Sequence, residues 1–223
     1  MSTLIINLFG APGAGKSTGA AYVFAKLKMS GIKAELVTEV AKDLTWDENE
    51  TLLSSQDYVF AAQHHRIRRL IDKVDVVVTD SPLLLSAIYE KPDMFPRSFR
   101  DFVCDMFDQY ENLNFFVRRV KPYVPVGRNQ TEQQSDVIAD KILDLLGDDY
   151  YEVDGDLNGY EKIFEAVKLY LSYMAAPEEG KHSVLVKPVP VSPAERAAAE
   201  TAIKYQRIRN VLQEIRRESK GDQ

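Results

Sequence analysis

The chain has 223 residues, 45% of them hydrophobic and 28% charged, so it can bury a full core and should be soluble. Its net charge of −6 disfavours a protein coated in nucleic acid, and its single cysteine, Cys104, excludes an internal disulfide. No apolar run approaches the ~20 residues that span a bilayer, and the first strand begins too early to leave room for a signal peptide. We therefore expect a cytoplasmic protein without a membrane partner, in which Cys104 is a core residue of an apolar helix.

Apolar segments of strand length alternate with segments of helical periodicity along most of the chain. This alternation predicts an α/β fold with a five-stranded parallel sheet covered by helices on both faces. A polar loop is expected at 43–51. The expected strands are 4–9, 34–38, 74–79, 114–120 and 150–153, and the expected helices are 16–29, 53–71, 83–89, 97–110, 132–146 and 157–174.

The chain changes character after residue 175. Residues 175–180 read as a linker, 183–191 as an extended arm with prolines, and 194–218 as a long Ala-rich helix. Two parts are therefore predicted, a domain over 1–175 and an appendage over 176–223. The helix carries more basic than acidic side chains, which would suit either DNA contact or a homodimer interface.

The chemistry is most plainly marked near the N-terminus, where the sequence fits G-x-x-x-x-G-K-[ST] between a predicted strand and a predicted helix. Glycines let such a loop point several backbone N–H groups at one anion, and the helix N-terminus adds its positive end. Lys16 is expected to reach the β- and γ-phosphates of ATP, and Ser17 to ligate Mg²⁺. The nucleotide-binding residues predicted here are Gly10, Ala11, Pro12, Gly13, Ala14, Gly15, Lys16, Ser17 and Thr18.

Two carboxylates follow predicted strands, Glu39 after the second and Asp80 after the third. Ligands of doubly wound sheets bind beyond the carboxyl ends of the strands, so both side chains are candidates for the site. We favour Glu39 as the base that accepts the acceptor's hydroxyl proton, and Asp80 as a residue that holds magnesium or steers the acceptor. The alternatives are a helix N-terminal charge for Glu39 and a cap on the helix opened by Pro82 for Asp80.

The segment Lys121–Gln130, with two prolines, a glycine and two cations, is expected to be a lid, placed at 121–131. Arg128 in this lid is predicted to contact the leaving phosphate. Arg118 and Arg119 end the fourth strand, and since neighbouring strand residues point to opposite faces, only one can face the site; Arg118 is assigned to the nucleotide. Thr131 and Gln134 fit a capping box at the start of the next helix.

Gln63 and Arg66 share one face of the helix between the second and third strands, where they would contact the acceptor unless that face is simply solvated. His64 and His65 point about 100° apart on a helix and cannot easily bind one metal together.

Together these segments resemble the small P-loop kinases of nucleosides and nucleoside monophosphates, especially the nicotinamide-riboside-kinase-like group, whose stand-alone members are often phage-encoded. The similar pieces are LFGAPGAGKST at 8–18, LVTEVAKDL at 36–44, QHHRIRRL at 63–70, VVVTDSPLLLSAIY at 76–89 and VGRNQTEQQSDVIADKI at 126–142. The resemblance implies a carboxylate near the acceptor hydroxyl at Glu39, acceptor contacts at Gln63 and Arg66, and a lid arginine at Arg128. It covers roughly 1–174, and no adenylyltransferase domain is present as in some relatives.

Three functions compete. The first is a kinase that transfers the γ-phosphate of ATP to a nucleoside, a nucleotide or a riboside-like small molecule. The second is a kinase of polynucleotide, acting on a DNA end or a modified base, which the basic C-terminal helix suggests. The third is an ATPase switch or motor, for which a second acidic residue is expected after Asp80, where this chain has Ser81 and Pro82.

Overall fold

The computed structural model describes residues 2–90, 93–124 and 131–175. The predicted arm and helix after residue 175, and Arg128 in the predicted lid, lie outside the described residues. The chain divides into two compact units, Met1–Phe164 and Glu165–Gln223. The sheet and the candidate site belong to the first unit, which is the one described below.

Strands and helices alternate in the described chain as the apolar pattern predicts. The strands form one sheet in the order β2-β3-β1-β4-β5, and every neighbouring pair is parallel. This confirms the predicted α/β fold with a five-stranded parallel sheet. The elements are β1 (Leu4–Phe9), α1 (Lys16–Met29), β2 (Ala34–Val37), α2 (Val40–Trp46), α3 (Glu50–Ser54), α4 (Gln56–Arg68), β3 (Val76–Thr79), α5 (Leu85–Tyr89), α6 (Arg97–Asp108), β4 (Glu111–Arg118), α7 (Glu132–Leu146), β5 (Tyr151–Asp154) and α8 (Leu157–Ala175).

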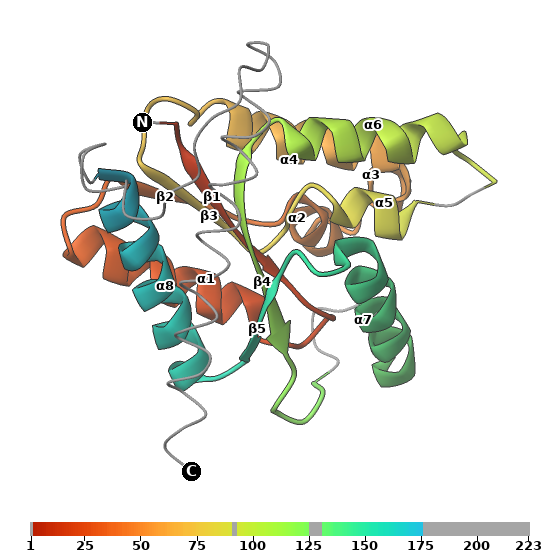
Figure 1. Ribbon diagram of the computed structural model, residues 1–223. Coiled ribbons are helices and arrows are strands. Elements are labelled where there is room, and N and C mark those ends of the chain that lie inside the picture. Colours follow the sequence, from red (N-terminus) through yellow and green to blue (C-terminus); the bar gives the residue numbers. More distant parts are fainter. Residues whose placement is uncertain (1, 91–92, 125–130, 176–223) are drawn as a thin grey trace, which may run out of the picture. The chain divides into compact units, whose positions relative to one another are not determined.

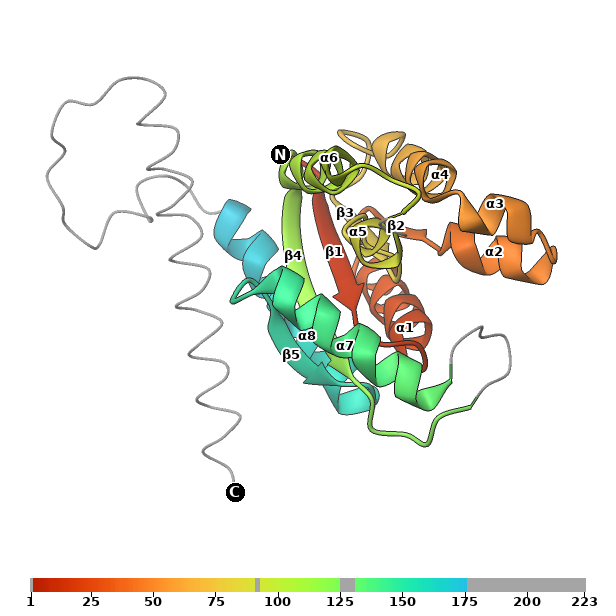
Figure 2. The same cartoon turned by 90° about the vertical axis from the view of Figure 1, so that its right-hand side faces the viewer.

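The central strands are buried on both faces. All six residues of β1 and all four of β3 are buried, which is why both strands read as continuous apolar runs rather than as alternating ones. One face of the sheet packs against α4, α5, α6 and α7 through a core that includes Ile5, Phe9 and Val77. The other face is covered by α1, as Figures 1 and 2 show. Helices on both faces make this a three-layer arrangement.

The prediction of a polar loop at 43–51 was wrong, because helix α2 occupies Val40–Trp46 and α3 occupies Glu50–Ser54. Val40 and Leu44, one helical turn apart, form a small satellite core with Val59 of α4. The long helix expected at 53–71 is consequently interrupted at Ser55, and only Gln56–Arg68 forms α4. The fourth strand also begins earlier than expected, at Glu111.

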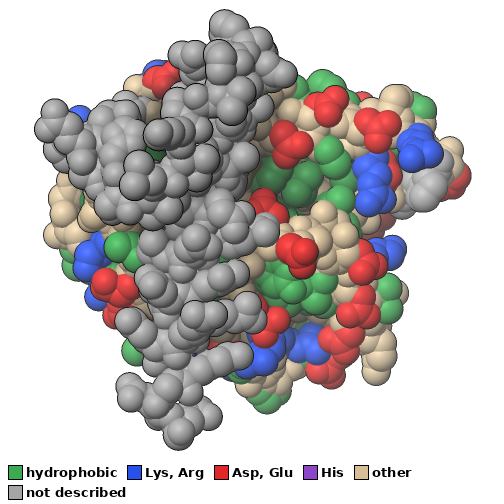
Figure 3. Space-filling model, in the orientation of Figure 1, with side chains coloured by type: hydrophobic (Ala, Val, Ile, Leu, Met, Phe, Trp, Pro, Cys, Tyr) green, Lys and Arg blue, Asp and Glu red, His purple; other side chains and the backbone are tan. Residues whose placement is uncertain are grey.

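The surface is acidic along one helix. Figure 3 shows acidic side chains gathered on the side where α7 runs, and this helix carries an exposed acidic residue every four positions, at Glu132, Asp136, Asp140 and Asp144. The negative charge of these four side chains would repel the phosphate backbone of a nucleic acid. None of the helices within the described ranges is long and apolar enough to cross a membrane.

Candidate active site

The loop between β1 and α1 has the backbone of a phosphate cradle. Gly10, Gly13 and Gly15 have φ values of 140°, 87° and 98°, which residues with a Cβ rarely adopt. A Cβ on Gly10 would lie 2.5 Å from the carbonyl oxygen of Val117, so the loop could not approach β4 as closely with any other residue. Gly15 then caps α1, whose first turn contains no acidic residue, and the helix presents its positive end to the loop.

Side chains from two other elements hold this loop from outside. The buried hydroxyl of Ser135 on α7 donates to the Pro12 carbonyl at 2.8 Å and accepts from Arg119 at 3.1 Å. The hydroxyl of Tyr160 donates to the Gly15 carbonyl at 3.0 Å. The ammonium group of Lys16 donates to the carbonyls of Gly10 and Ala11 at 2.8 and 3.2 Å. These bonds occupy carbonyl groups of the loop, and the motif assigns its backbone N–H groups to an anion.

A cleft of about 470 Å³ runs from the phosphate loop along the carboxyl ends of β2 and β3. The near end is lined by residues of the loop and the start of α1, and Glu39 lies on its wall. The far end is formed by α2, α3 and α4 on one side and by the segment leading into α5 on the other. The lining residues are Pro12, Gly13, Gly15, Lys16, Ser17, Thr18, Glu39, Ala41, Lys42, Thr45, Trp46, Leu53, Gln56, Val59, Gln63, Ser81, Pro82, Leu85, Ser86 and Tyr89.

Glu39 stands at the N-cap position of α2, yet its side chain makes no capping hydrogen bond. Burial raises the pKa of its carboxyl; the nearby Lys16 ammonium partly offsets this rise, and the negative charge of Asp80 adds to it. Glu39 in turn contributes to the raised pKa of Tyr89, although burial of the phenol is the larger cause. The carboxylate is therefore electrostatically coupled to the phosphate-loop lysine and to Tyr89 in the far half of the cleft.

Asp80 follows β3 and is 4% exposed, and its Oδ1 has no hydrogen-bond partner among the described residues. Helix α5 begins only at Leu85 with Leu84 at its N-cap, so Asp80 does not cap it. A buried carboxylate oxygen without a partner is costly unless a cation or water satisfies it. Ser17 lines the cleft with an exposed hydroxyl, whereas Asp80 lies just outside the lining, next to Ser81; both offer oxygen, the ligand atom that magnesium prefers.

Arg118, the predicted nucleotide contact at the end of β4, pairs with carboxylates of β5. Its guanidinium contacts Asp154 at 2.5 and 2.8 Å and Glu152 at 3.5 Å. Arg119 instead turns toward the phosphate loop through Ser135 and pairs with Asp136 of α7. The two arginines thus diverge, as neighbouring residues at a strand end should.

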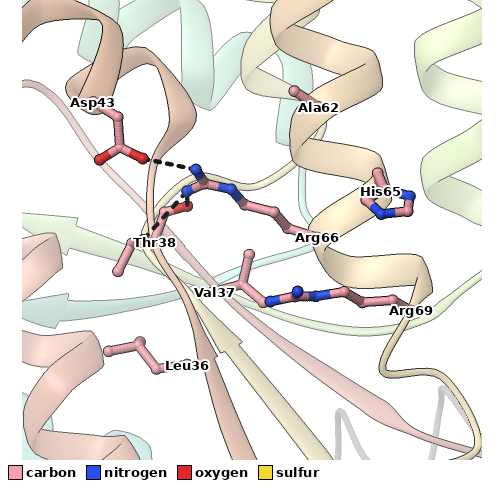
Figure 4. Close-up of a pocket in the computed structure, with 8 residues that line it drawn as sticks. All are labelled: Leu36, Val37, Thr38, Asp43, Ala62, His65, Arg66 and Arg69. Atoms are coloured by element: carbon pink, nitrogen blue, oxygen red, sulfur yellow. Dashed lines mark hydrogen bonds and ion pairs between the residues drawn. The ribbon is translucent and has the colours of Figure 1, made fainter. Parts of the chain in front are cut away.

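The two predicted acceptor residues, Gln63 and Arg66, line different hollows. Gln63 is 3% exposed and lines the cleft. Arg66 lines a second pocket of about 570 Å³ at the outer edge of β2, drawn in Figure 4, where it pairs with Asp43 at 2.7 Å. The structure therefore brings Lys16, Ser17, Glu39 and Gln63 to one cleft, but not Arg66.

Sequence reasoning missed several residues of the far half of the cleft. Trp46, the only tryptophan of the chain, lines the cleft while 63% exposed, and the buried Gln56 has an Oε1 without a hydrogen-bond partner among the described residues. An apolar residue that lines a cleft and remains exposed is a candidate for ligand contact. Trp46 is missed because the polar composition of residues 43–51 predicts a loop there.

His64 and Cys104 contact other side chains of the fold and do not line the cleft. His64 lies 2.6 Å from the Tyr110 hydroxyl, and burial lowers the pKa of its imidazole. Cys104 packs at the edge of the main core, where burial raises the pKa of its thiol. No cluster of three or more metal-ligating side chains exists within 2–90, 93–124 and 131–175.

The capping box predicted at the start of the helix after the lid is confirmed. The Thr131 hydroxyl accepts from the Gln134 backbone N–H, and the Gln134 side chain accepts from the Thr131 N–H at 2.8 Å.

The chain is similar to a family of domains and to solved structures. Among solved structures, the chain is similar to deoxyadenosine kinase from M. mycoides with bound dATP, at 16% identity and a TM-score of 0.45, over 75% of this chain and 99% of that one. The comparison with curated proteins finds no match. The family described as AAA domain matches residues 5–158, which include the phosphate loop, Glu39 and Asp80. This match spans more than half of the chain, and the chain belongs to that family of P-loop domains.

Proposed function

We propose that this protein is an ATP-dependent kinase that transfers the γ-phosphate to a hydroxyl of a nucleoside, a nucleotide or a riboside-like molecule. The observation that carries the proposal is the cleft itself, which continues from the phosphate loop past the half-buried Glu39 carboxylate into a second half lined by apolar and amide side chains. A protein that only hydrolyses ATP has no need of this second half. Phosphoryl transfer needs two substrates held in line, and the cleft offers a place for each.

In the proposed reaction the N–H groups of the loop and Lys16 hold the β- and γ-phosphates. Glu39 accepts the proton of the acceptor hydroxyl while that oxygen bonds to the γ-phosphorus and the bond from the γ-phosphorus to the bridging oxygen of ADP breaks. Ser17 and Asp80 would hold Mg²⁺, which neutralises phosphate charge when bound. Lid closure with Arg128 at the leaving phosphate remains a proposal, as does nucleotide contact by Arg118.

The acceptor is proposed to carry a planar ring beside its reactive hydroxyl. Trp46 and Tyr89 offer aromatic faces to the far half of the cleft, and Leu53 and Val59 offer apolar surface. The Gln56 amide, whose Oε1 needs a donor, could accept from a ring N–H or amino group. Nucleosides and ribosides combine such a ring with primary and secondary hydroxyls.

The test is transfer of label from γ-³²P-ATP in the presence of magnesium to a panel of nicotinamide riboside, adenosine, deoxyadenosine, cytidine, thymidine, their 5′-monophosphates and DNA. The proposal expects label on one or more small molecules. Label on DNA alone would favour the polynucleotide kinase, and free phosphate independent of every acceptor would favour the ATPase switch. The acidic stripe on α7 disfavours the DNA outcome.

A further inference from the structure

The buried side-chain amide of Gln63 forms hydrogen bonds to the backbone on both sides of Glu39. Gln63 of α4 accepts a hydrogen bond from the Val40 N–H at 3.0 Å and donates one to the Thr38 carbonyl at 3.3 Å. Thr38 and Val40 are the residues immediately before and after Glu39. Because both ends of the Gln63 amide are occupied by backbone, the side chain fixes this turn rather than offering its polar groups to a ligand.

A second side chain of α4, Arg66, binds the same turn. Arg66 donates to the Thr38 carbonyl at 3.2 Å and to the Thr38 hydroxyl at 3.4 Å. Its other terminal nitrogen donates to the Asp43 carboxylate of α2 at 2.7 Å. Figure 4 shows the guanidinium reaching from α4 across the outer pocket to both residues. One planar group thus joins the end of β2 to the first turns of α2.

The Glu39 carboxylate depends on such support from outside. It makes no capping hydrogen bond, and no other hydrogen bond holds it within the described part of the chain. The buried residues of the helix that follows, Val40 and Leu44, belong to a small core with Val59. The direction of the Glu39 side chain into the cleft therefore follows from the backbone at 38–40. Three side-chain hydrogen bonds from α4 meet this backbone, at the Thr38 carbonyl and the Val40 N–H.

We propose that Gln63 and Arg66 are positioning residues, which hold the Thr38–Val40 turn so that the Glu39 carboxylate stays inside the cleft beside Lys16. The inference rests on the base role of Glu39 in the proposed function. It replaces direct acceptor contact as the main task of these two side chains. Small displacements of a reacting group cost a large part of its catalytic effect, up to ~10²-fold for about 1 Å.

The first test reads the position of Glu39 without any acceptor. The side-chain carboxyl ¹³C signal of Glu39, assigned by its loss in Glu39→Gln, is titrated in the full chain as wild type, Arg66→Ala and Gln63→Met. Burial raises the pKa of this carboxyl, so a turn that swings toward water should lower it toward the ordinary value of a glutamate. Arg66 is part-exposed, so Arg66→Ala is the variant expected to remain folded if Gln63→Met does not.

The outer pocket offers a matched control and a rescue. Arg69, the C-cap residue of α4, lines the same pocket, and its side chain makes no hydrogen bond or ion pair to the described residues. In Arg69→Ala, the Glu39 carboxyl should titrate with the same pKa as in the wild type. Because the pocket is open, millimolar guanidinium should enter the space left in Arg66→Ala and restore the titration of Glu39, which a generally loosened fold would not do.

In the transfer assay, Arg66→Ala should lower kcat by ~10-fold with little change in KM for ATP, and guanidinium should restore it. A wild-type titration of Glu39 in both Arg66→Ala and Gln63→Met would overturn the inference. So would an equal change in Arg69→Ala. If Glu39→Gln retains full transfer activity, the proposed base role fails instead, and the titration shows separately whether the two side chains fix the turn.

Discussion

Glu39 combines the features of a base at a transfer site, since it is a carboxylate in a cleft, coupled to Lys16 and Asp80, and not used as a helix cap. Glu39→Gln should lower kcat by ~10²-fold or more with little change in ATP affinity, because only proton transfer is lost. The control is Glu35→Gln, whose carboxylate pairs with Lys28 on the surface. If Asp80→Asn has this effect while Glu39→Gln is mild, the two roles are reversed.

The raised pKa of Glu39 leads to a prediction for the pH dependence of kcat/KM. A base works in its ionised form, so kcat/KM should fall as the pH drops through the pKa of Glu39, at a higher pH than for an ordinary glutamate with a pKa of about 4.3. The charge of Asp80 raises that pKa and the charge of Lys42 lowers it. Asp80→Asn should therefore move the acid limb to lower pH and Lys42→Met to higher pH. A limb that stays in place in both variants would contradict the assignment.

At the scale of residues, the sequence predicts those site residues that belong to a motif of fixed spacing or that directly follow a strand. The glycine loop, Lys16 and Glu39 could be found because the motif and the order of strands bring them to one edge of the sheet. The contact of Gln63 with the backbone could not, since hydrogen bonds between a helix and a distant turn leave no periodic signal. Arg66 shares a helix face with Gln63 and donates to the same Thr38 carbonyl, yet it lines the outer pocket while Gln63 lines the cleft.

At the scale of elements, α7 reaches the phosphate loop through one hydroxyl. Ser135→Ala leaves the Pro12 carbonyl and Arg119 without this partner, which should cost about 1–3 kcal/mol of unfolding free energy and raise KM for ATP. Thermal unfolding and ATP titration measure the two effects. The control is Ser30→Ala, whose exposed hydroxyl donates to the Lys26 carbonyl and whose loss should cost less than ~0.5 kcal/mol. Equal behaviour of the two variants would show that the contact does not support the loop.

The elements that sequence reasoning misplaced are short and depend on tertiary packing. Residues 43–51 are rich in polar side chains and lack a long apolar stripe, so they read as a loop. Helix α2 forms because Val40 and Leu44 bury one edge against Val59, a residue distant in sequence. Asn49, by contrast, carries a local signal, since its side chain accepts from the Leu52 N–H and opens α3.

At the scale of the whole molecule, the two halves of the cleft should respond to different ligands. Trp46 is the only tryptophan and lies in the far half, so its fluorescence reports the acceptor site without labelling. A nucleoside or riboside that is phosphorylated should quench or shift this emission in a saturable way. The change should persist in Lys16→Ala, which removes an ammonium group at the phosphate loop but no residue of the far half. Emission that ignores every phosphorylated acceptor would place the acceptor outside the cleft.

The central claim is that phosphate moves within this cleft from ATP to an alcohol and not to water. The most direct measurement is the reaction with Mg²⁺, ATP and the acceptor panel in ¹⁸O-labelled water, analysed by mass spectrometry of the phosphate products. We predict a small-molecule phosphoester free of ¹⁸O, with its formation lost in Lys16→Ala. Inorganic phosphate labelled with ¹⁸O as the sole product, formed at the same rate with and without acceptors, would contradict the account.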